Sequence, residues 1–516
     1  MAGGEKFYVT TPIYYVNDAP HLGHAYTTVA CDALTRFRRL DGAEVLFTTG
    51  TDEHGQKVEN SAQAAGVAPQ AFCDRVSQTF RAMNALLGID THDFVRTTEQ
   101  RHIDCATELW NRIAANGAGD IYLGKYGYWY SVRDEAPYDE SELVNGKAPT
   151  GADVEWVEEE NYFFRLSAWQ DRLLAFYEAN PDFIGPTARR NEVMSFVKGG
   201  LRDLSISRTS FTWGIPVPGD AKHIMYVWIE ALSVYLTGAG FPDTASARYQ
   251  KFWPCDLHMV GKDIIRFHCV YWPAFLMAAG LPVPKRVFGH GWWTVEGQKM
   301  SKSLGNFIPP KVLVDTYGLD PSRYFMLREL PFGADGDFSH RAMVSRINGD
   351  LANDLGNLAQ RVLTMVQRYC EGRVPAPGPF TAPDQALLGA ARALLAALRV
   401  EYAVPAYHRA LEQIWVVVGD ANRYVDEQAP WALRKSEPAR CDTVLYVLAD
   451  TIRHLAILVQ PMMPGSMTKL LDQLAVPPDR RDFAALAASP LVAGTMLPKP
   501  KGIFPRYVEE GIDAGR

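Results

Sequence analysis

The feature that most constrains the fold is an alternation of strand-like and helix-like composition at the start of the chain. Residues 6–15 are β-branched and aromatic, residues 22–40 carry apolar side chains at helical spacing, and residues 44–49 return to strand composition. A strand–helix–strand unit of this kind is typical of a parallel sheet covered by helices. The chain has 516 residues, enough for about three domains.

A second set of the same kind lies in the middle of the chain. It comprises strands at Leu257–Val260 and Arg286–Phe288 around a helix at Asp263–Ala279, and residues 292–300 follow as a short hairpin. Between the two sets, residues 116–222 form an insert rich in tyrosine, tryptophan and acidic residues, with few helical stretches. The sequence therefore predicts a parallel sheet whose two halves are separated by an insert.

The carboxyl end of the chain has a different pattern. From about residue 341 onward, long amphipathic helices are expected at 341–369, 384–401, 405–427 and 439–459, with a proline-rich joint at 374–383. Hydrophobic residues make up 47% of the chain and charged residues 22%, a usage that excludes a disordered or collagen-like protein. The chain therefore combines an α/β part with an α-helical part.

The charge of the chain is unevenly distributed. Its 52 lysines and arginines against 59 acidic residues leave a net charge of −7, which argues against a nucleic-acid partner if the charge is evenly spread. Residues 131–160 alone carry ten acids and two bases, a net of −8, so the rest of the chain sums to +1. Residues 341–516 hold 20 bases and 18 acids. The acidity is local to the insert, and the objection to a nucleic-acid partner falls away.

Targeting and redox signals place the chain in the cytoplasm. The seven cysteines are scattered and form no CxxC pair, as is usual for reduced thiols in a cytosolic protein. The amino terminus carries no signal-peptide or transit-peptide pattern. The longest uncharged apolar stretch, Cys269–Pro284, contains three prolines and is too short to span a bilayer. We therefore expect a soluble cytoplasmic protein with no membrane partner.

A short motif, HLGH at 21–24, stands where the first strand leads into the first helix. A helix N-terminus offers unpaired N–H groups and the positive end of the helix dipole, both of which suit phosphate. His21 and His24 lie on one face and can donate to phosphate oxygens, while Gly23 lets a flat base approach the backbone. The alternatives are two histidines that only begin the helix, or half of a metal site.

A second motif, KMSKS at 299–303, follows the predicted hairpin. Lys299 and Lys302, on a mobile loop, can clamp a triphosphate and neutralise the charge that develops as pyrophosphate leaves. The alternative is a solvated basic loop. The chain has neither a P-loop pattern nor a GxGxxG pattern, so P-loop ATPases and dinucleotide enzymes lose support.

Together, the two motifs form the paired signature of class I aminoacyl-tRNA synthetases, which the chain resembles. In detail it is similar to the bacterial methionyl-tRNA synthetases from Tyr8 to about Leu458. Four further segments carry the resemblance: 12–17 (PIYYVN), 50–55 (GTDEHG), 226–232 (YVWIEAL) and 261–268 (GKDIIRFH). The resemblance implies an α/β fold: a doubly wound, Rossmann-type catalytic domain with a connective insert, followed by an α-helical anticodon-binding bundle.

The resemblance divides the chain into six segments. The expected boundaries are 1–115 for the first half of the catalytic domain, 116–222 for the insert, 223–310 for the second half, 311–340 for a stem-contact connector, 341–480 for the anticodon-binding domain and 481–516 for a tail. The sequence does not indicate what the tail packs against.

The resemblance also implies roles for particular residues. Asp52 takes the ammonium group of methionine, and several apolar residues line the side chain. The implied methionine-binding residues are Ile13, Tyr15, Asp52, Trp228, Ala231, Leu232, Tyr235, Ile264 and His268. The implied ATP-binding residues are His21, Gly23, His24, Lys299, Ser301 and Lys302, of which His21, His24, Lys299 and Lys302 are catalytic.

The aromatic residues of this set suit a thioether. Its sulfur is polarizable and gains from aromatic edges such as those of Tyr15, Trp228 and Trp272, and a tyrosine hydroxyl can donate to it weakly. Ile264 and His268 lie one helical turn apart and therefore point the same way. Any one of these residues, taken alone, fits a core aromatic cluster better than a ligand site.

At the helical end, the resemblance implies that the CAU anticodon is bound by Asn353, Asn357, Arg361, Pro430 and Trp431. An exposed tryptophan stacks on a splayed base, while asparagine and arginine contact base edges, which is how single-stranded RNA loops are recognised. The alternatives are a solvated face for the asparagines and a tryptophan that caps the core.

The chain departs from many relatives in two ways. Residues 106–254 contain no cysteine, so no structural zinc is expected in the insert. The chain ends at Arg516 without an appended tRNA-binding barrel, so a monomer is expected. The insert, with 107 residues, is also too short for a separate editing domain, which leaves discrimination to the pocket.

The activity implied by the resemblance depends on ATP. Methionine attacks the α-phosphate to form methionyl-adenylate and pyrophosphate, and the aminoacyl group then passes to tRNA(Met), including the initiator tRNA, with release of AMP. Mg²⁺ is expected to bind with ATP. Two alternatives are a small-molecule nucleotidylyltransferase, which has no use for the helical end, and a non-catalytic tRNA-binding paralogue, against which the intact motifs argue.

Overall fold

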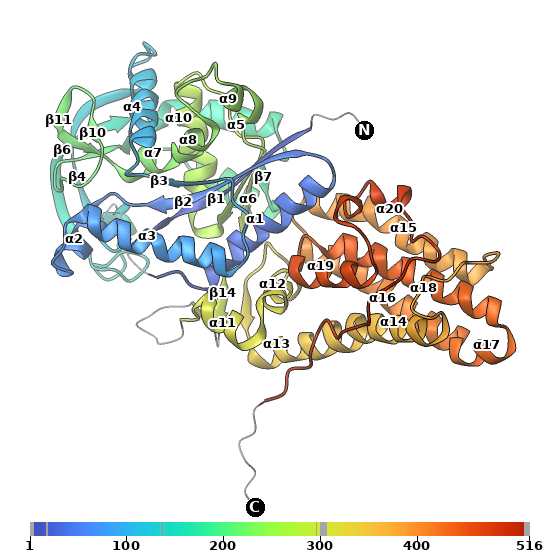
Figure 1. The fold of residues 1–516 in the computed structure, drawn as a ribbon. Coiled ribbons are helices and arrows are strands. Elements are labelled where there is room, and N and C mark those ends of the chain that lie inside the picture. Colours follow the sequence, from blue (N-terminus) through green and yellow to red (C-terminus); the bar gives the residue numbers. More distant parts are fainter. Residues whose placement is uncertain are drawn as a thin grey trace, which may run out of the picture.

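The α/β part of the chain is built on a parallel sheet. The computed structural model describes residues 5–16, 19–134, 136–138, 140–295, 297–299 and 307–509. Figure 1 shows the α/β part, blue to green, beside a helical part in orange and red. The main sheet has six strands, each paired in parallel with its neighbours. In order across the sheet they are β3 (Asp93–Arg96), β2 (Glu44–Asp52), β1 (Lys6–Tyr15), β12 (Leu257–Gly261), β13 (Val287–His290) and β7 (Ile184–Gly185).

The strand order reverses between β1 and β12, as it does in a doubly wound sheet. The fold class predicted from the sequence is thereby confirmed, as is the helical carboxyl part. In such sheets the ligand crevice lies outside the carboxyl ends of the strands, at the point of reversal. By this rule we expect the ligand crevice just beyond Tyr15 and Gly261, the last residues of these two strands.

Helix α1 (Leu22–Leu40) has the bounds predicted from its helical spacing, with His21 as its N-cap. Strand β2 runs three residues beyond its predicted end, through Gly50 to Asp52. A Cβ added at Gly50 would lie 1.9 Å from the carbonyl oxygen of Val95 in β3. Only glycine permits β2 and β3 to pair this closely, although glycine is a poor strand former.

The segment predicted as a helix over Asp263–Ala279 is helical from Lys262 to Ala278, but its hydrogen-bond spacing changes along its length. It begins with a 3-10 turn η3 (Lys262–Ile264), continues through a π-helical turn η4 (Phe267–Tyr271) and ends in helix α10 (Trp272–Ala278). Pro273 has no N–H to bond to the carbonyl of Cys269, four residues back. That carbonyl instead accepts a hydrogen bond from the Tyr177 hydroxyl at 2.6 Å. Helical periodicity alone does not reveal this change of hydrogen-bond partner.

The stretch 116–222 contains a second sheet. Its order is β5 (Ala136–Tyr138), β4 (Ile121–Ser131), β6 (Glu155–Phe164) and β8 (Leu204–Ser205). Helices α5 (Gln170–Ala179) and α6 (Thr187–Lys198) lie on either side of β7 in sequence. Because β7 pairs with β13, the chain returns to the main sheet within this stretch.

The remaining elements of the α/β part are short or cover the main sheet. The helices are α2 (Gln56–Ala64), α3 (Pro69–Leu86), α4 (Gln100–Ala114), α7 (Val227–Leu232), α8 (Val234–Ala239) and α9 (Ala247–Phe252). One small sheet holds β9 (Ser207–Arg208), β10 (Pro216–Val217) and β11 (Asp220–Met225). Another holds β14 (Trp293–Val295), β15 (Gln298–Lys299) and β16 (Gly336–Phe338), and contains the predicted hairpin.

The carboxyl part is a helical bundle. Its first run consists of α13 (His340–Arg346), the π turn η6 (Ile347–Gly356) and α14 (Asn357–Tyr369). There follow α15 (Ala382–Ala403), α16 (Tyr407–Gln428), α17 (Pro430–Ser436), α18 (Pro438–Val459), α19 (Pro464–Gln473) and α20 (Ala485–Ala488). The four long helices agree with the prediction, whereas α17, α19 and α20 were not predicted. Helix α18 is central, since every residue from Val447 to Val459 is buried.

A buried arginine joins the two parts through the connector, which contains α11 (Pro310–Tyr317) and α12 (Leu319–Arg328). Arg323 of α12 lies 2.6 Å from Asp32 of α1, and both side chains are fully buried. The guanidinium also donates to the carbonyls of Leu87, Pro461 and Met462. One side chain therefore binds the main sheet's helices to the bundle.

Replacing Arg323 with alanine should lower the free energy of unfolding by about 3–5 kcal/mol, because buried Asp32 keeps only Arg36 as a cationic partner and three buried carbonyls lose their donor. Arg423, which forms an exposed pair with Asp420, is the matched control, and its alanine variant should cost less than about 1 kcal/mol. Urea unfolding followed by fluorescence measures both. Equal losses in the two variants would contradict this role of Arg323.

Candidate active site

The crevice beyond β1 and β12 gathers the ends of several elements. Helix α1 follows β1 and therefore begins at the carboxyl edge of the sheet, and η3 follows β12 at the same edge. Helix α7 contributes a third wall, because its residues pack against side chains from the end of β1. Residues far apart in sequence can thus meet one bound molecule here.

His21 and His24 form a reciprocal cap on α1. Nδ1 of His21 accepts from the N–H of Gly23 at 3.0 Å, and Nδ1 of His24 accepts from the N–H of His21 at 3.1 Å. Because Nδ1 accepts in both rings, the ring proton of each neutral histidine lies on Nε2. A Cβ added at Gly23 would lie 2.8 Å from the His21 ring, so the cap requires glycine. The motif presents Nε2–H donors at a helix N-terminus, which suits phosphate.

The His24 ring is half-buried and neutral. It stacks on His21 with ring centroids 3.9 Å apart, and Tyr14 and Phe80 meet it edge-on. Burial, and secondarily the neighbouring His21, hold the pKa of His24 well below its ordinary value. The alternative, that these histidines only begin the helix, correctly describes what their Nδ1 atoms do but does not account for the Nε2 side of the rings. The cap engages the Nδ1 atoms, and Nε2 remains the donor side of each ring.

The second motif lies partly outside the described residues. Its first residue, Lys299, pairs with Thr294 across the β14–β15 hairpin, and its side chain is not described. Ser301 and Lys302 fall within 300–306, outside the described residues. Their expected roles therefore stay predictions.

The chain beyond that segment returns to α1. Phe307 meets the His21 ring edge-on, with centroids 5.6 Å apart. The carbonyl of Ile308 accepts from the N–H of Leu22, the first residue of α1, at 3.0 Å. Residues 307 and 308, the first described residues after the KMSKS motif, therefore lie at the first turn of the helix that carries the two histidines.

Four of the nine expected methionine-binding residues pack together at the crevice. The small apolar cluster consists of Ile13, Tyr15, Tyr226, Trp228 and Ala231. Tyr15 pairs with Asp52 in the register between β1 and β2, and Asp52 is buried at 2% exposure. A carboxylate thus lies at the strand end beside the cluster, in a position that suits an ammonium group.

The other expected residues lie around this cluster. Leu232 is buried in the larger core of the α/β part, and Ile264 packs on the edge of that core. Trp228 stacks on Phe267, with ring centroids 3.6 Å apart and planes 22° apart. The sequence did not single out Phe267, although it lies within the motif segment 261–268, because the π turn η4 decides where its ring points.

Tyr235 and His268 form a buried pair. The Tyr235 hydroxyl lies 2.6 Å from Nε2 of His268, whose Nδ1 lies 2.9 Å from the carbonyl of Ile264. Because a carbonyl only accepts, the ring proton is on Nδ1 and Tyr235 donates to Nε2. Burial lowers the pKa of His268 to about 4, which keeps the ring neutral. The hydroxyl proton of Tyr235 is thus engaged within the protein rather than free for a sulfur atom.

Trp272 and Arg208 change the picture of an aromatic wall around the methionine side chain. Trp272 is fully buried and its indole N–H donates to His258 at 3.3 Å, so it supports the pocket from within the core. Arg208 is 2% exposed, and its guanidinium lies 3.9 Å from the centroid of the Tyr226 ring. A lone arginine in a short strand carries no signal in one sequence. Only the fold shows that it brings positive charge to the small apolar cluster.

The expected anticodon residues lie on one stretch of the bundle. Asn353, Asn357 and Arg361 follow at intervals of four residues along η6 and α14, and both asparagines are exposed. Trp431 is 44% exposed, and the Arg361 guanidinium lies 5.9 Å from the centroid of its ring. That exposure does not fit a tryptophan that caps the core. Pro430 is buried as the first residue of α17.

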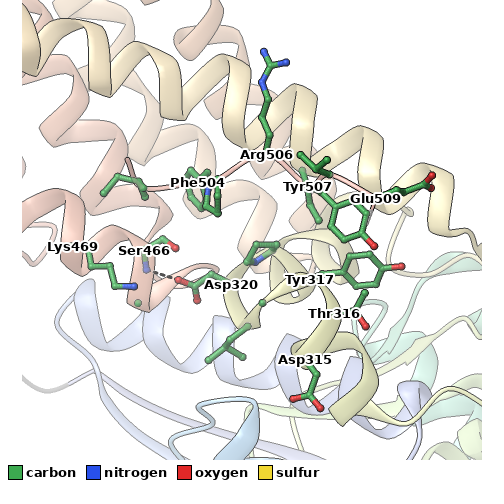
Figure 2. Close-up of a pocket in the computed structure, with 18 residues that line it drawn as sticks. Asp315, Thr316, Tyr317, Asp320, Ser466, Lys469, Phe504, Arg506, Tyr507 and Glu509 are labelled. Carbon is green, nitrogen blue, oxygen red and sulfur yellow. Dashed lines mark hydrogen bonds between the residues drawn. The ribbon is translucent and has the colours of Figure 1, made fainter. Parts of the chain in front are cut away.

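The C-terminal tail reaches the same stretch. Arg506 donates to the side chain of Asn353, and the backbone of Tyr507 makes two hydrogen bonds to Asn348, at 2.8 and 3.1 Å. Figure 2 shows the tail along one side of a cavity of about 1530 Å³, with Tyr317 and Asp320 of the connector opposite. The sequence gives no sign of this packing.

Family models match both parts of the chain. A model described as tRNA synthetases class I (M) matches residues 7–154 and 136–363, and one described as the anticodon binding domain of methionyl tRNA ligase matches residues 374–514. The chain belongs to the methionyl-tRNA synthetase family. The second match also removes the nucleotidylyltransferase alternative, which has no use for such a domain.

Similar proteins cover nearly the whole of this synthetase. The methionine–tRNA ligases of Mesorhizobium japonicum and Mycobacterium tuberculosis are each 56% identical, over 98% of both chains. The structure titled Mycobacterium tuberculosis methionyl-tRNA synthetase in complex with methionyl-adenylate has a TM-score of 0.95 and 54% identity, covering 97% of this chain and 100% of that one. The free-state structure of the same enzyme has a TM-score of 0.89 and 52% identity, covering 98% of this chain and 99% of that one.

In the described part of this synthetase, no three His, Cys, Asp or Glu side chains gather in a way that could hold a metal ion. All seven cysteines are free thiols, six of them buried. Among the helices described, none is long and apolar enough to cross a bilayer.

Proposed function

We propose that the crevice between β1 and β12 is where this enzyme forms methionyl-adenylate. The chain is a methionine–tRNA ligase: it activates methionine with ATP, releases pyrophosphate, and transfers the methionyl group to tRNA(Met) with release of AMP. The observation that carries the site assignment is the reciprocal cap. It leaves the ring protons of His21 and His24 on Nε2 at a helix N-terminus, where phosphate is stabilised.

In this proposal five residues act on the phosphates of ATP. His21 and His24 donate to phosphate oxygens, and Gly23 leaves room for the nucleotide beside the backbone. Lys299 and Lys302, together with Ser301, bind the departing pyrophosphate and stabilise its charge. The methionine carboxylate attacks the α-phosphorus directly, so no protein nucleophile is needed and catalysis consists of positioning and charge stabilisation.

Methionine is held by a charged end and an apolar end. Asp52 binds the ammonium group, and the small apolar cluster encloses the side chain. The remaining residues that shape this pocket are Leu232, Tyr235, Ile264 and His268. Because Tyr235 and His268 are bonded to each other, they offer the thioether a polarizable wall rather than a donated proton.

The finer assignments are also proposals. Residues 1–115 and 223–310 form the catalytic domain, 116–222 the insert, 311–340 a stem-contact connector, 341–480 the anticodon-binding domain and 481–516 the tail. Asn353, Asn357, Arg361 and Trp431 bind the CAU anticodon of elongator and initiator tRNA(Met), with Pro430 setting the turn. Each proposed site is made of residues of a single chain and requires no second copy, so we propose a monomer. We also propose that the enzyme acts in the cytoplasm, where its substrates are.

Mg²⁺ would enter with ATP and neutralise part of its phosphate charge. The described residues gather no carboxylate cluster for a divalent ion, so we assign it no protein ligands.

Pyrophosphate exchange into ATP, measured with each of the twenty amino acids, tests the function as a whole. Methionine alone should support rapid exchange, and comparable exchange with leucine would contradict the proposed pocket.

Replacing Asp52 with asparagine should raise the KM for methionine roughly 10- to 100-fold, since a charge-assisted hydrogen bond contributes about 1.5–3 kcal/mol. The KM for ATP should stay within about threefold, because the change removes only an interaction with the amino acid. Steady-state exchange kinetics measure both constants. Asp90, which pairs with Arg39 at the surface, serves as the control for loss of an aspartate charge.

A further inference from the structure

A buried carboxylate that the proposed chemistry does not use lies behind the methionine pocket. Glu230 is 1% exposed, and its Oε1 atom accepts from Nδ1 of His54 at 2.8 Å. Nε2 of His102 lies 3.5 Å from the same oxygen, and its Nδ1 lies 3.0 Å from the Thr237 hydroxyl. Both histidines are buried as well. An acid and two histidines thus meet in the interior of the catalytic domain.

The carboxylate is ionised despite its surroundings. Burial by itself would raise the pKa of Glu230, but the neighbouring His54 and His102 outweigh it and lower the pKa to about 2. An apolar residue would fill the same space without the desolvation penalty of a charge, so a buried ionic group is poor evidence for stability alone. An ionised Glu230 at this position therefore indicates that the carboxylate positions neighbouring residues of the pocket.

The hydrogen bond between His54 and Glu230 joins two separate pieces of the pocket. His54 stands two residues after Asp52, on the loop that leaves β2. Glu230 stands on α7 between Trp228 and Ala231, two members of the small apolar cluster. The loop itself is held by Trp213, whose N–H donates to the carbonyl of Glu53 at 2.5 Å and whose ring meets His54 edge-on. This bond therefore ties the ammonium end of the pocket to its apolar wall from behind, in addition to the strand pairing of Asp52 with Tyr15.

We propose that Glu230 and His54 are positioning residues for methionine, and that their hydrogen bond holds the Asp52 carboxylate in register with the α7 wall of the pocket. This inference rests on the proposed roles of Asp52 and the small apolar cluster. Neither Glu230 nor His54 touches the substrate. Together they keep the ammonium anchor and the thioether wall at the spacing of one methionine, and His102 lies 3.5 Å from the same carboxylate oxygen.

The test compares Glu230→Ala, Glu230→Gln and His54→Ala in pyrophosphate exchange. Glu230→Ala should raise the KM for methionine about tenfold, with kcat and the KM for ATP within about threefold, because only the spacing of the methionine site changes. Glu230→Gln keeps the length and an oxygen that accepts from His54, so it should recover most of the loss. His54→Ala should reproduce Glu230→Ala, and the double variant should be no worse than either.

Asp384→Asn is the matched control. Asp384 is a fully buried carboxylate in the bundle, bonded to Arg440 at 2.6 Å, so its loss should lower the melting temperature without changing the KM for methionine. An unchanged KM for methionine in folded Glu230→Ala or His54→Ala would overturn the inference, and so would equal rises in the KM for methionine and for ATP. If Glu230→Ala does not fold, the KM for methionine of His54→Ala tests the inference in its place.

The same data separate this inference from the proposed function beneath it. If Asp52→Asn leaves the KM for methionine unchanged, the pocket itself is wrongly placed. If Asp52→Asn raises that KM while the Glu230 and His54 variants do not, the pocket stands and only the positioning role fails.

Discussion

Replacing Lys302 with alanine is expected to slow adenylate formation roughly 100- to 1000-fold, the usual effect of removing one preorganised donor from a developing charge. The departing pyrophosphate gains that charge as the P–O bond breaks, so the charge is absent from the bound substrates and begins to develop in the transition state. The KM for methionine should therefore stay nearly constant while kcat falls. Single-turnover formation of methionyl-adenylate, followed in a quenched-flow instrument, measures the chemical step directly.

Lys311 provides the matched control for this change. It lies in α11 just beyond the KMSKS segment, its side chain is 73% exposed, and it pairs with Asp315 on the same helix. Alanine at position 311 should leave the rate within about twofold, because an exposed pair of this kind contributes little. A Lys302→Ala enzyme with normal kcat and a raised KM would instead assign Lys302 to uniform substrate binding.

Replacing Trp431 with alanine should lower kcat/KM for tRNA(Met) about 10- to 100-fold, since stacking on one unpaired base contributes about 1–3 kcal/mol. Pyrophosphate exchange, which needs no tRNA, should be unaffected. The split between the two assays is the informative quantity, because Trp431 lies on the bundle and the adenylate forms in the α/β part. Aminoacylation and exchange assays on one preparation measure it.

Trp156 is a suitable control for the loss of an exposed tryptophan. It lies in the insert and is 55% exposed, against 44% for Trp431. Its alanine variant should charge tRNA at the normal rate if the acidic insert is turned away from the RNA. A Trp431→Ala enzyme that loses exchange and charging together would show that this residue holds the bundle in shape.

Much of the fold follows from local patterns. The bounds of α1 agree with the helical spacing of its apolar residues, and the motif His21–His24 lies at its start as the strand-to-helix change predicts. The helix predicted over 263–279 is present, but its hydrogen bonds change spacing near Pro273, which lacks a donor, and Tyr177 of another helix donates to the carbonyl of Cys269. Short helices that begin with proline, such as α17, escaped notice because they hold too few residues to show a period.

The candidate site likewise combines features that neighbouring residues predict with contacts that form only when the chain folds. The sequence alone predicted the class of fold and, through the family resemblance, the two motifs proposed for phosphate and the segments proposed for methionine, because periodicity and short motifs are properties of neighbouring residues. The tertiary structure decided which ring nitrogen of His21, His24 and His268 carries the proton. It also decided that the Tyr235 hydroxyl is engaged and that Glu230 meets His54 across 176 residues of chain. Protonation and pairing depend on burial and on partners brought together by folding, and one sequence contains no record of those distances.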